Sequence, residues 1–256
     1  MTLTGSTPLW IELDGAVNAR VVVPGVLLRS DNLQGLSARD LRTLVDGHGV
    51  EIVLDLRTGN EVRLEGPGPM TREPLVRIEH RSLYPESGNT DLDIEEAVTV
   101  WRTVADHVYP AETRVVRAYM SYLVRRPDSV TESLRAIAQA EGAVLVHCAA
   151  GKDRTGMVVA LALDAVGWDR EAIVTDYLAT VERIEQIMER LRSSETYRAE
   201  LEGHSAQQHA PLPGTMERVL DLIDERYGGT VTFLRQNGLD DADLELLRRR
   251  LRQDAV

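Results

Sequence analysis

The stretch AVLVHCAAGKDRTGMVVALAL, residues 143–163, holds an apolar run, a short polar segment and a second, longer apolar run. The first run, residues 143–147, is short and continuous, which predicts a central strand covered on both faces. Residues 155–167 are apolar nearly all round, which predicts a buried helix. The polar segment HCAAGKDR lies between them and contains a glycine. The sequence therefore predicts a strand, a loop and a helix in direct succession.

The same alternation extends toward the N-terminus. Residues 21–30 are rich in β-branched side chains around Pro24 and Gly25, which predicts a strand or a hairpin. Residues 37–49 are predicted to form a helix capped by their first serine, and residues 51–57 a buried strand. Strand, helix and strand in this order are typical of an α/β fold with parallel pairing. We therefore expect a central, mostly parallel sheet flanked by helices.

The rest of the chain continues this pattern without a Pro/Gly/Ser-rich linker, so we expect one domain over residues 1–256. A further strand is expected at 75–83, and loops at 59–74, 84–91 and 203–214. Helices are expected at 94–108, 111–126, 129–141, 170–192, 215–227, 230–237 and 240–252. The amphipathic helix and polar loop between residues 170 and 214 either form a lid over a site or pack as an ordinary helix.

Composition excludes several classes of partner. The net charge of -12 and the aromatic content of 4% argue against a nucleic-acid surface. The N-terminus lacks a basic region followed by an apolar run, and nowhere do 18 uncharged apolar residues follow one another. We therefore expect a cytoplasmic protein without stable membrane insertion, and leave export by a signal-independent route open.

The polar segment after the central strand has the chemistry of an anion site. A loop entering a helix N-terminus presents unpaired backbone N–H groups and the positive end of the helix dipole, so phosphate or another oxyanion is expected to occupy it. The same field stabilises a thiolate, which predicts a nucleophile at Cys148, the only cysteine. A buried structural thiol is the alternative. One cysteine excludes an internal disulfide, and the six histidines lack metal-binding spacing, so neither a metal nor a cofactor is expected.

The residues that follow complete this site. Arg154 lies at the first turn of the expected helix, where its guanidinium offers two parallel donors to phosphate oxygens. Gly151 allows the loop to turn, and Gly156 lets the helix approach it closely. The hydroxyl of Thr155 is placed to donate to the thiolate as it leaves. The loop backbone at Ala149 and Ala150, together with Gly151, Lys152, Thr155 and Gly156, is expected to bind substrate.

This loop resembles the signature His-Cys-x5-Arg-Thr-Gly of the cysteine-dependent protein tyrosine phosphatases. With Lys-Asp inside the loop, it is most similar to the bacterial enzymes that also act on phosphoinositides. Shorter similarities to that family lie at residues 18–20, 25–33, 55–57 and 176–178. The resemblance implies hydrolysis of phosphate monoesters on phosphotyrosine, and also on phosphoserine, phosphothreonine or phosphoinositides, through a phosphocysteine intermediate. A phosphoprotein or a phosphoinositide is then the partner.

The general acid stays open between two places. The resemblance points either to Asp153 inside the loop or to an acidic residue after the strand that ends near Leu83. In the second place this chain has Glu86, Asp91 and Asp93, which departs from the family's Pro-Asp pattern. We favour Asp153. In an alternative interpretation it orients the loop through a salt bridge.

Lys152 is the only lysine in a chain that otherwise uses arginine. This suggests that the position requires a compact ammonium and not a broad planar guanidinium. We expect it to serve a substrate with a second phosphate, and chance solvent exposure is the alternative. His147 is expected to order the loop. Arg29, Asp55 and Arg57 lie at strand ends, where they either line the site or form loop-bracing ion pairs.

Two rival functions remain at this point. A rhodanese-type sulfurtransferase also holds a cysteine in an anion-binding loop, although the Arg-Thr-Gly ending fits it poorly. A phosphotyrosine-binding pseudophosphatase is the non-enzymatic alternative, although such modules usually lack the nucleophile or the arginine.

Overall fold

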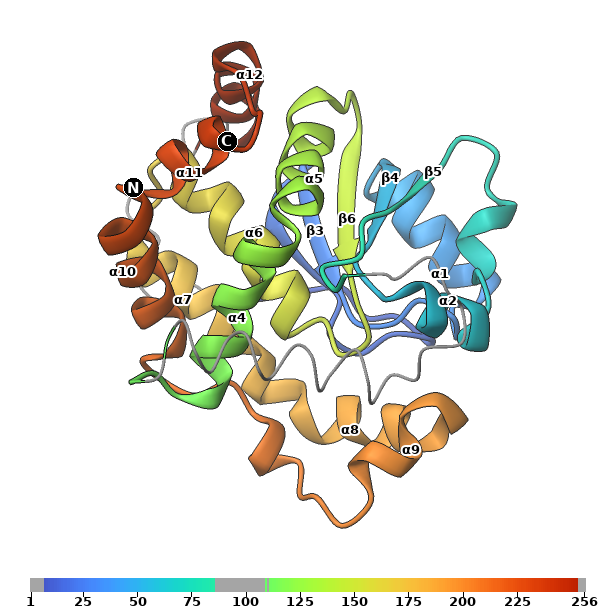
Figure 1. The fold of residues 1–256 in the computed structure, drawn as a ribbon. Coiled ribbons are helices and arrows are strands. Elements are labelled where there is room, and N and C mark those ends of the chain that lie inside the picture. Colours follow the sequence, from blue (N-terminus) through green and yellow to red (C-terminus); the bar gives the residue numbers. More distant parts are fainter. Residues whose placement is uncertain (1–6, 86–108, 110, 253–256) are drawn as a thin grey trace.

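The computed structural model describes residues 7–85, 109 and 111–252 (Figure 1). In these ranges six strands form one sheet in the order β1-β2-β3-β6-β4-β5. The strands are β1 (Leu9–Trp10), β2 (Arg20–Val23), β3 (Leu27–Ser30), β4 (Val50–Asp55), β5 (Arg77–His80) and β6 (Ala143–His147). β3, β6, β4 and β5 are parallel, whereas β1 and β2 add an antiparallel edge. The expected α/β fold with a mostly parallel sheet is confirmed.

Helices flank this sheet. The α-helices are α1 (Ala38–Arg42), α2 (Gly59–Glu65), α4 (Arg114–Arg125), α5 (Pro127–Gln139), α6 (Asp153–Ala165), α7 (Arg170–Ala179), α8 (Ile184–Ser193), α9 (Glu195–Leu201), α10 (Thr215–Tyr227), α11 (Thr230–Gln236) and α12 (Asp241–Leu251). Shorter helical turns are η1 (Thr43–Gly47), η2 (Pro69–Arg72), η3 (Thr180–Arg183) and η4 (Gln207–His209). No helix in the described ranges is long and apolar enough to cross a membrane.

The strand β6 lies between β3 and β4 and is buried along its whole length. Val144 and Val146 face the large core formed with α4, α5, α6 and α10. Ala143 and Leu145 face a second core that includes Leu44 from η1. This alternation follows the two-residue repeat of a strand, and burial on both faces explains why β6 reads as a continuous apolar run.

The register brings three strand ends to one level. Ser30 at the end of β3 and Asp55 at the end of β4 both pair with His147 at the end of β6. The segments that follow these strands therefore start side by side. This placement decides which distant residues meet the loop after β6.

Several expected elements are confirmed with small shifts in their bounds. The hairpin at 21–30 is β2 and β3, and Gly25 in its turn has a positive φ. Ser37 caps α1 in a capping box with Asp40. The other expected elements with described counterparts are 37–49, 51–57, 75–83, 111–126, 129–141, 155–167, 215–227, 230–237 and 240–252. The helix expected at 94–108 lies outside the described residues.

The loop expected at 59–74 is wrong, because residues 59–65 form α2 and a 3-10 turn follows. Thr58 caps α2: its hydroxyl accepts from the backbone N–H of Glu61, and the Glu61 carboxylate accepts from the backbone N–H of Thr58. This capping box starts the helix despite the glycines and prolines that follow.

The single helix expected at 170–192 is also wrong. The segment divides into α7, the 3-10 turn η3 and α8. Ile173 and Tyr177 of α7 belong to the large core, whereas Ile184 and Met188 of α8 belong to a small separate cluster. Because the two halves pack against different cores, the chain changes course between them, and Val181 in the turn is exposed.

Candidate active site

The loop of residues 148–152, called here the Cys148 loop, connects β6 directly to α6. Cys148 is buried just beyond the end of the strand. Gly151 has a φ of 66°, and a Cβ there would lie 2.3 Å from the carbonyl oxygen of Ser30. Only glycine fits this position, both for its backbone conformation and for its distance from β3.

The backbone N–H groups of this loop are free of protein partners. Within the described residues, the N–H groups of residues 149–154 donate no hydrogen bond. The buried hydroxyl of Thr155, one turn into α6, also has no partner there. Free donors around a cysteine at a helix N-terminus are the arrangement that binds an oxyanion.

Arg154 is held in place by Glu61. Its Nη1 and Nη2 donate to the two carboxylate oxygens at 2.6 and 2.9 Å, and Nη1 also approaches the Leu56 carbonyl oxygen at 3.3 Å. The Nε–H and the second hydrogen of Nη2 lie on one edge of the guanidinium, and neither is used within the described residues. Arg154 therefore keeps two parallel donors for a ligand.

Glu61 connects this arginine to a helix beyond the loop. Burial alone would raise the pKa of Glu61, but Arg154 and the cap hydrogen bonds of Thr58 lower it to about 2. The same carboxylate accepts from the hydroxyl of Tyr197 on α9 at 3.1 Å. Neither Glu61 nor Tyr197 was predicted from the sequence. The spacing Thr58-x-x-Glu61 is a signal that could have revealed α2 and its acidic residue.

Asp153 is the first residue of α6 and is bound by a buried tyrosine. The hydroxyl of Tyr119 donates to Asp153 Oδ1 at 2.6 Å and lies 2.9 Å from the hydroxyl of Tyr177. Burial, followed by the charge of Asp153, raises the pKa of Tyr119 well above its ordinary value, so this hydroxyl keeps its proton. The Lys152 ammonium lies 3.5 Å from the same Asp153 oxygen, which is the salt bridge considered as an alternative role.

Lys152 turns toward the segment after α9. Its Nζ donates to the carbonyl oxygen of His209 at 2.6 Å, and its side chain is 14% exposed. The lysine is therefore not a freely exposed surface residue. The other candidate acids, Glu86, Asp91 and Asp93, lie outside the described residues.

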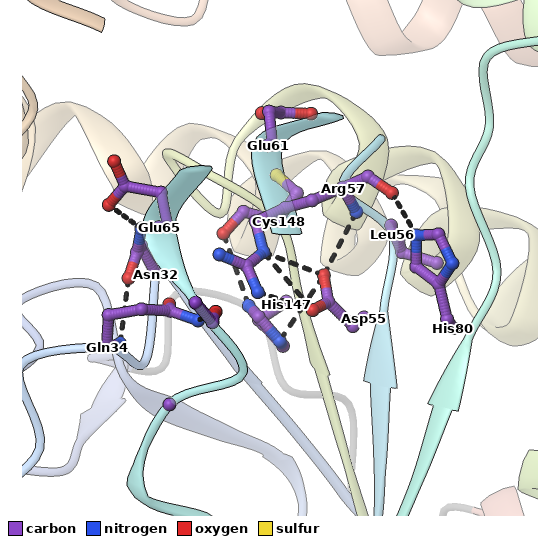
Figure 2. A network of polar contacts seen from close by, with 12 residues as sticks. Asn32, Gln34, Asp55, Leu56, Arg57, Glu61, Glu65, His80, His147 and Cys148 are labelled. Atoms are coloured by element: carbon purple, nitrogen blue, oxygen red, sulfur yellow. Dashed lines mark hydrogen bonds and ion pairs between the residues drawn. The ribbon is translucent and has the colours of Figure 1, made fainter. Parts of the chain in front are cut away.

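A second buried network, which includes Asp55, Arg57 and His147, lies near Cys148 (Figure 2). Arg57 donates to both oxygens of Asp55, and His147 Nε2 lies 3.6 Å from Asp55 Oδ1. His80 Nε2 is 2.7 Å from the Arg57 carbonyl oxygen. Burial lowers the pKa of His147 to about 4, so its ring is neutral at pH 7. The structure places Asp55 and Arg57 in an ion pair that braces the segment after β4.

The segment after α7 covers the Cys148 loop on its other side. Ala149 packs in a small cluster with apolar side chains of α8, α9 and the following turn. Figure 1 shows α8 and α9 beyond the lower ends of the strands, apart from the helices that flank the sheet. In the described part of the chain, no group of three or more His, Cys, Asp and Glu side chains could hold a metal ion.

Comparison with known proteins identifies the family. The model of the tyrosine phosphatase family matches residues 12–253. The chain is 29% identical to the triple specificity protein phosphatase PtpB of Mycobacterium tuberculosis, over 93% of this chain and 95% of that protein. It is 26% identical to a tyrosine-protein phosphatase of Nostoc commune, over 93% of this chain and 78% of that protein. A crystal structure of TpbA from P. aeruginosa with pTyr covers 85% of this chain and 98% of that chain, at 16% identity and a TM-score of 0.41. Because the family model spans nearly the whole chain, this protein belongs to the tyrosine phosphatase family.

Proposed function

We propose that this protein hydrolyses phosphate monoesters through a phosphocysteine intermediate on Cys148. The Cys148 thiolate attacks phosphorus, so that an S–P bond forms while the ester P–O bond breaks and the leaving oxygen takes a proton from an acid. Water then attacks phosphorus, the S–P bond breaks, and inorganic phosphate and the thiolate are released.

One observation carries this proposal: a run of backbone N–H groups without a described protein partner follows Cys148 directly. The unpartnered N–H groups of residues 149–154 begin beside Cys148, and Arg154 keeps two parallel donors on one edge. Phosphoryl transfer needs mainly positioning and charge stabilisation from the protein, which such donors supply. In this role the loop from Ala149 to Lys152 and the hydroxyl of Thr155 bind the phosphoryl oxygens, whereas the Gly156 N–H donates to the Lys152 carbonyl oxygen and closes the first turn of α6.

Asp153 is the acid that we propose for the leaving group. It lies in the same segment as Cys148 and Arg154, and its Oδ1 is oriented by the hydroxyl of Tyr119. Asp153→Asn should flatten the alkaline limb of the pH profile of kcat, because the acid must carry its proton when the ester bond breaks, whereas Glu86→Gln should not. If only Glu86→Gln flattens that limb, the acid belongs to the segment after Leu83.

We further propose that the substrates include phosphoinositides as well as phosphotyrosine and phosphoserine or phosphothreonine. The relative named a triple specificity phosphatase supports a broad substrate range. Lys152 places an ammonium beside Asp153 at the edge of the loop, where a second phosphate would meet it. Lys152→Ala should reduce phosphoinositide turnover more than turnover of a small aryl phosphate. Equal losses on both substrates would contradict this role.

We also propose that the segment from α8 to η4 acts as a lid of the one phosphatase domain. It packs on Ala149, and Lys152 contacts it through the His209 carbonyl oxygen. In this proposal the segment moves away from Ala149 and Lys152 when a bulky phosphorylated substrate enters the loop.

Phosphate release from a panel of phosphotyrosine, phosphoserine and phosphoinositide substrates tests the function. The wild type should turn over at least phosphotyrosine, and Cys148→Ser should abolish turnover while retaining binding. Retention of phosphopeptides by the wild type without release would support a binding module. Cyanide-dependent thiocyanate formation without phosphate release would support a sulfurtransferase.

A further inference from the structure

We propose that four residues behind the Cys148 loop, the buried Asn18, Arg20 and Arg29 and the partly exposed Asp176, are positioning residues that keep the loop N–H groups directed toward the ligand. We call these four residues the rear network. The inference rests on the proposed function and adds to it the part of the protein that shapes the phosphate cradle.

The rear network binds the carbonyl oxygens of the loop. Asn18 Nδ2 donates to the carbonyl oxygen of Ala150 at 2.9 Å and to that of Gly151 at 3.2 Å. Arg29 Nη2 donates to the Gly151 carbonyl oxygen at 2.7 Å. The preceding carbonyl, of Ala149, accepts from the backbone N–H of Asn32 at 2.9 Å. Three successive loop carbonyls are thus held from the β2–β3 side.

Peptide geometry converts these contacts into an orientation of the donors. In a trans peptide the C=O of one residue and the N–H of the next point in opposite directions. In the part of the chain that the structure describes, there are no cis peptide bonds. Fixing the carbonyls of Ala150 and Gly151 on the rear side therefore turns the N–H groups of Gly151 and Lys152 away from it. Those N–H groups are among the free donors of the loop.

The network is itself ordered by charge and hydrogen bonds. Arg20 donates from Nε to Asp176 Oδ1 at 2.9 Å and from Nη1 to Asn18 Oδ1 at 2.6 Å. Arg29 Nη1 donates to the other oxygen of Asp176. The contact from Arg20 fixes the amide of Asn18, so that its Nδ2 and not its oxygen faces the loop. Asn18, Arg20 and Arg29 are all buried.

The charges of the network do not cancel. Two arginines share one carboxylate, so the four residues carry a formal excess of one positive charge, and Glu182 is a further acidic group that acts on Arg20. Burial, together with Arg29, lowers the pKa of Arg20 only to about 10, so the Arg20 guanidinium is charged at neutral pH. A buried cation near the loop favours both a thiolate and a bound phosphate.

None of the four side chains belongs to the donors proposed to touch the phosphate. The network nevertheless packs closely against the start of α6. A Cβ on Gly156 would lie 3.7 Å from Arg29 Nη2 and 3.1 Å from the ring of Tyr177, which neighbours Asp176 in the chain. The rear network would thus act through the backbone, and its loss would change the thiolate and the cradle together.

The test uses two variants of the full chain, Arg29→Gln and Asn18→Ala, and the fact that Cys148 is the only cysteine. Alkylation by iodoacetamide therefore reports on this sulfur alone, and its rate is measured against pH. Competition by inorganic phosphate and turnover of a small aryl phosphate are measured in parallel, with thermal unfolding as the check of folding. Arg135→Gln, which breaks the ion pair with Asp243 between α5 and α12, is the matched control.

Arg29→Gln should move the midpoint of the alkylation profile upward by about one pH unit. Both variants should weaken inhibition by phosphate roughly tenfold. Arg29→Lys, which keeps the charge but cannot bind Asp176 and Gly151 as a fork, should restore the alkylation midpoint more fully than the phosphate inhibition. Arg135→Gln should lower the melting temperature without moving either readout.

A folded Asn18→Ala or Arg29→Gln protein with wild-type alkylation midpoint and phosphate inhibition would overturn the proposal. If Arg29→Gln does not fold, Asn18→Ala alone tests the proposal, because it removes hydrogen bonds to the loop carbonyls without removing a charge. Alkylation and phosphate binding do not require turnover. A wild type that releases no phosphate would thus refute the proposed function. The alkylation rate and the competition by inorganic phosphate would still test the role of the rear network.

Discussion

Glu61 holds both terminal nitrogens of Arg154, and the free edge of that guanidinium depends on it. In Glu61→Gln, the amide NH2 would face an arginine N–H, so that two donors oppose each other. We expect kcat/KM for a small aryl phosphate to fall by about 10- to 100-fold, the range for losing a hydrogen bond to a charged group.

Glu65→Gln is the matched control for that measurement. Glu65 lies on the same helix and accepts from Asn32 and Ser194, and it has no contact with Arg154. It should leave kcat/KM within a fewfold of the wild type. Similar losses in both variants would mean that α2 acts only as a structural element.

His147 makes the fold sensitive to acid. Burial, followed by Arg57, lowers its pKa from an ordinary 6.5 to about 4, against the attraction of Asp55. Between these two pH values His147 binds a proton in the unfolded chain but not in the folded chain. The free energy of unfolding therefore falls as the pH falls. The difference between the pKa values of His147 in the unfolded and folded states corresponds to about 3 kcal/mol of unfolding free energy.

Urea unfolding at several pH values between about 4 and 6.5 measures this loss. His147→Asn should lose less stability over the interval than the wild type, because its side chain takes up no proton. His48→Asn, remote from the network, should follow the wild-type curve. Parallel curves for wild type and His147→Asn would assign the acid sensitivity to other groups.

At the scale of elements, the Cys148 loop is fixed by its contact with β3. Gly151 and Gly25 both have φ near +67°, at 66° and 68°, but a Cβ on Gly151 would meet the Ser30 backbone whereas one on Gly25 would meet nothing within 4 Å. The two glycines therefore separate the effect of backbone conformation from that of close approach.

Gly25→Ala should cost about 1–2 kcal/mol of unfolding free energy, from the left-handed conformation alone. Gly151→Ala adds a backbone collision and should cost about 4 kcal/mol or more, with loss of turnover in whatever protein folds. Chemical denaturation of both variants measures the difference. Equal costs would show that the loop can move away from β3 freely.

At the scale of the whole molecule, ligand binding should couple the loop to global stability. Inorganic phosphate bound to the folded state alone adds about 2.7 kcal/mol at a concentration 100 times its dissociation constant. For a chain of 256 residues this should raise the melting temperature by roughly 5–10 °C. Potassium chloride at equal ionic strength should give a much smaller shift.

Arg154→Lys separates specific binding from a general salt effect. It keeps the charge but loses the parallel donors, so its phosphate-induced shift in melting temperature should be clearly smaller than that of the wild type. A full shift in the variant would place the stabilising phosphate elsewhere on the protein.

The sequence alone predicted the strand, loop and helix around Cys148, because each depends on neighbouring residues: an apolar run, a glycine and a second apolar run. It also predicted the α/β fold and most helices from their periodicity. It misjudged residues 59–74, where prolines and glycines outweighed a short capping signal, and 170–192, where a continuous apolar stripe serves two separate cores.

Only the tertiary structure decided which residues support the loop. Glu61 is 93 residues from Arg154, and Arg29 is 122 residues from Gly151. They meet because β3 and β4 flank β6 in parallel with their ends at one level, and no local pattern encodes that register. Local sequence thus specified the chemical groups of the site, whereas the long-range pairing of strands determined what holds them in place.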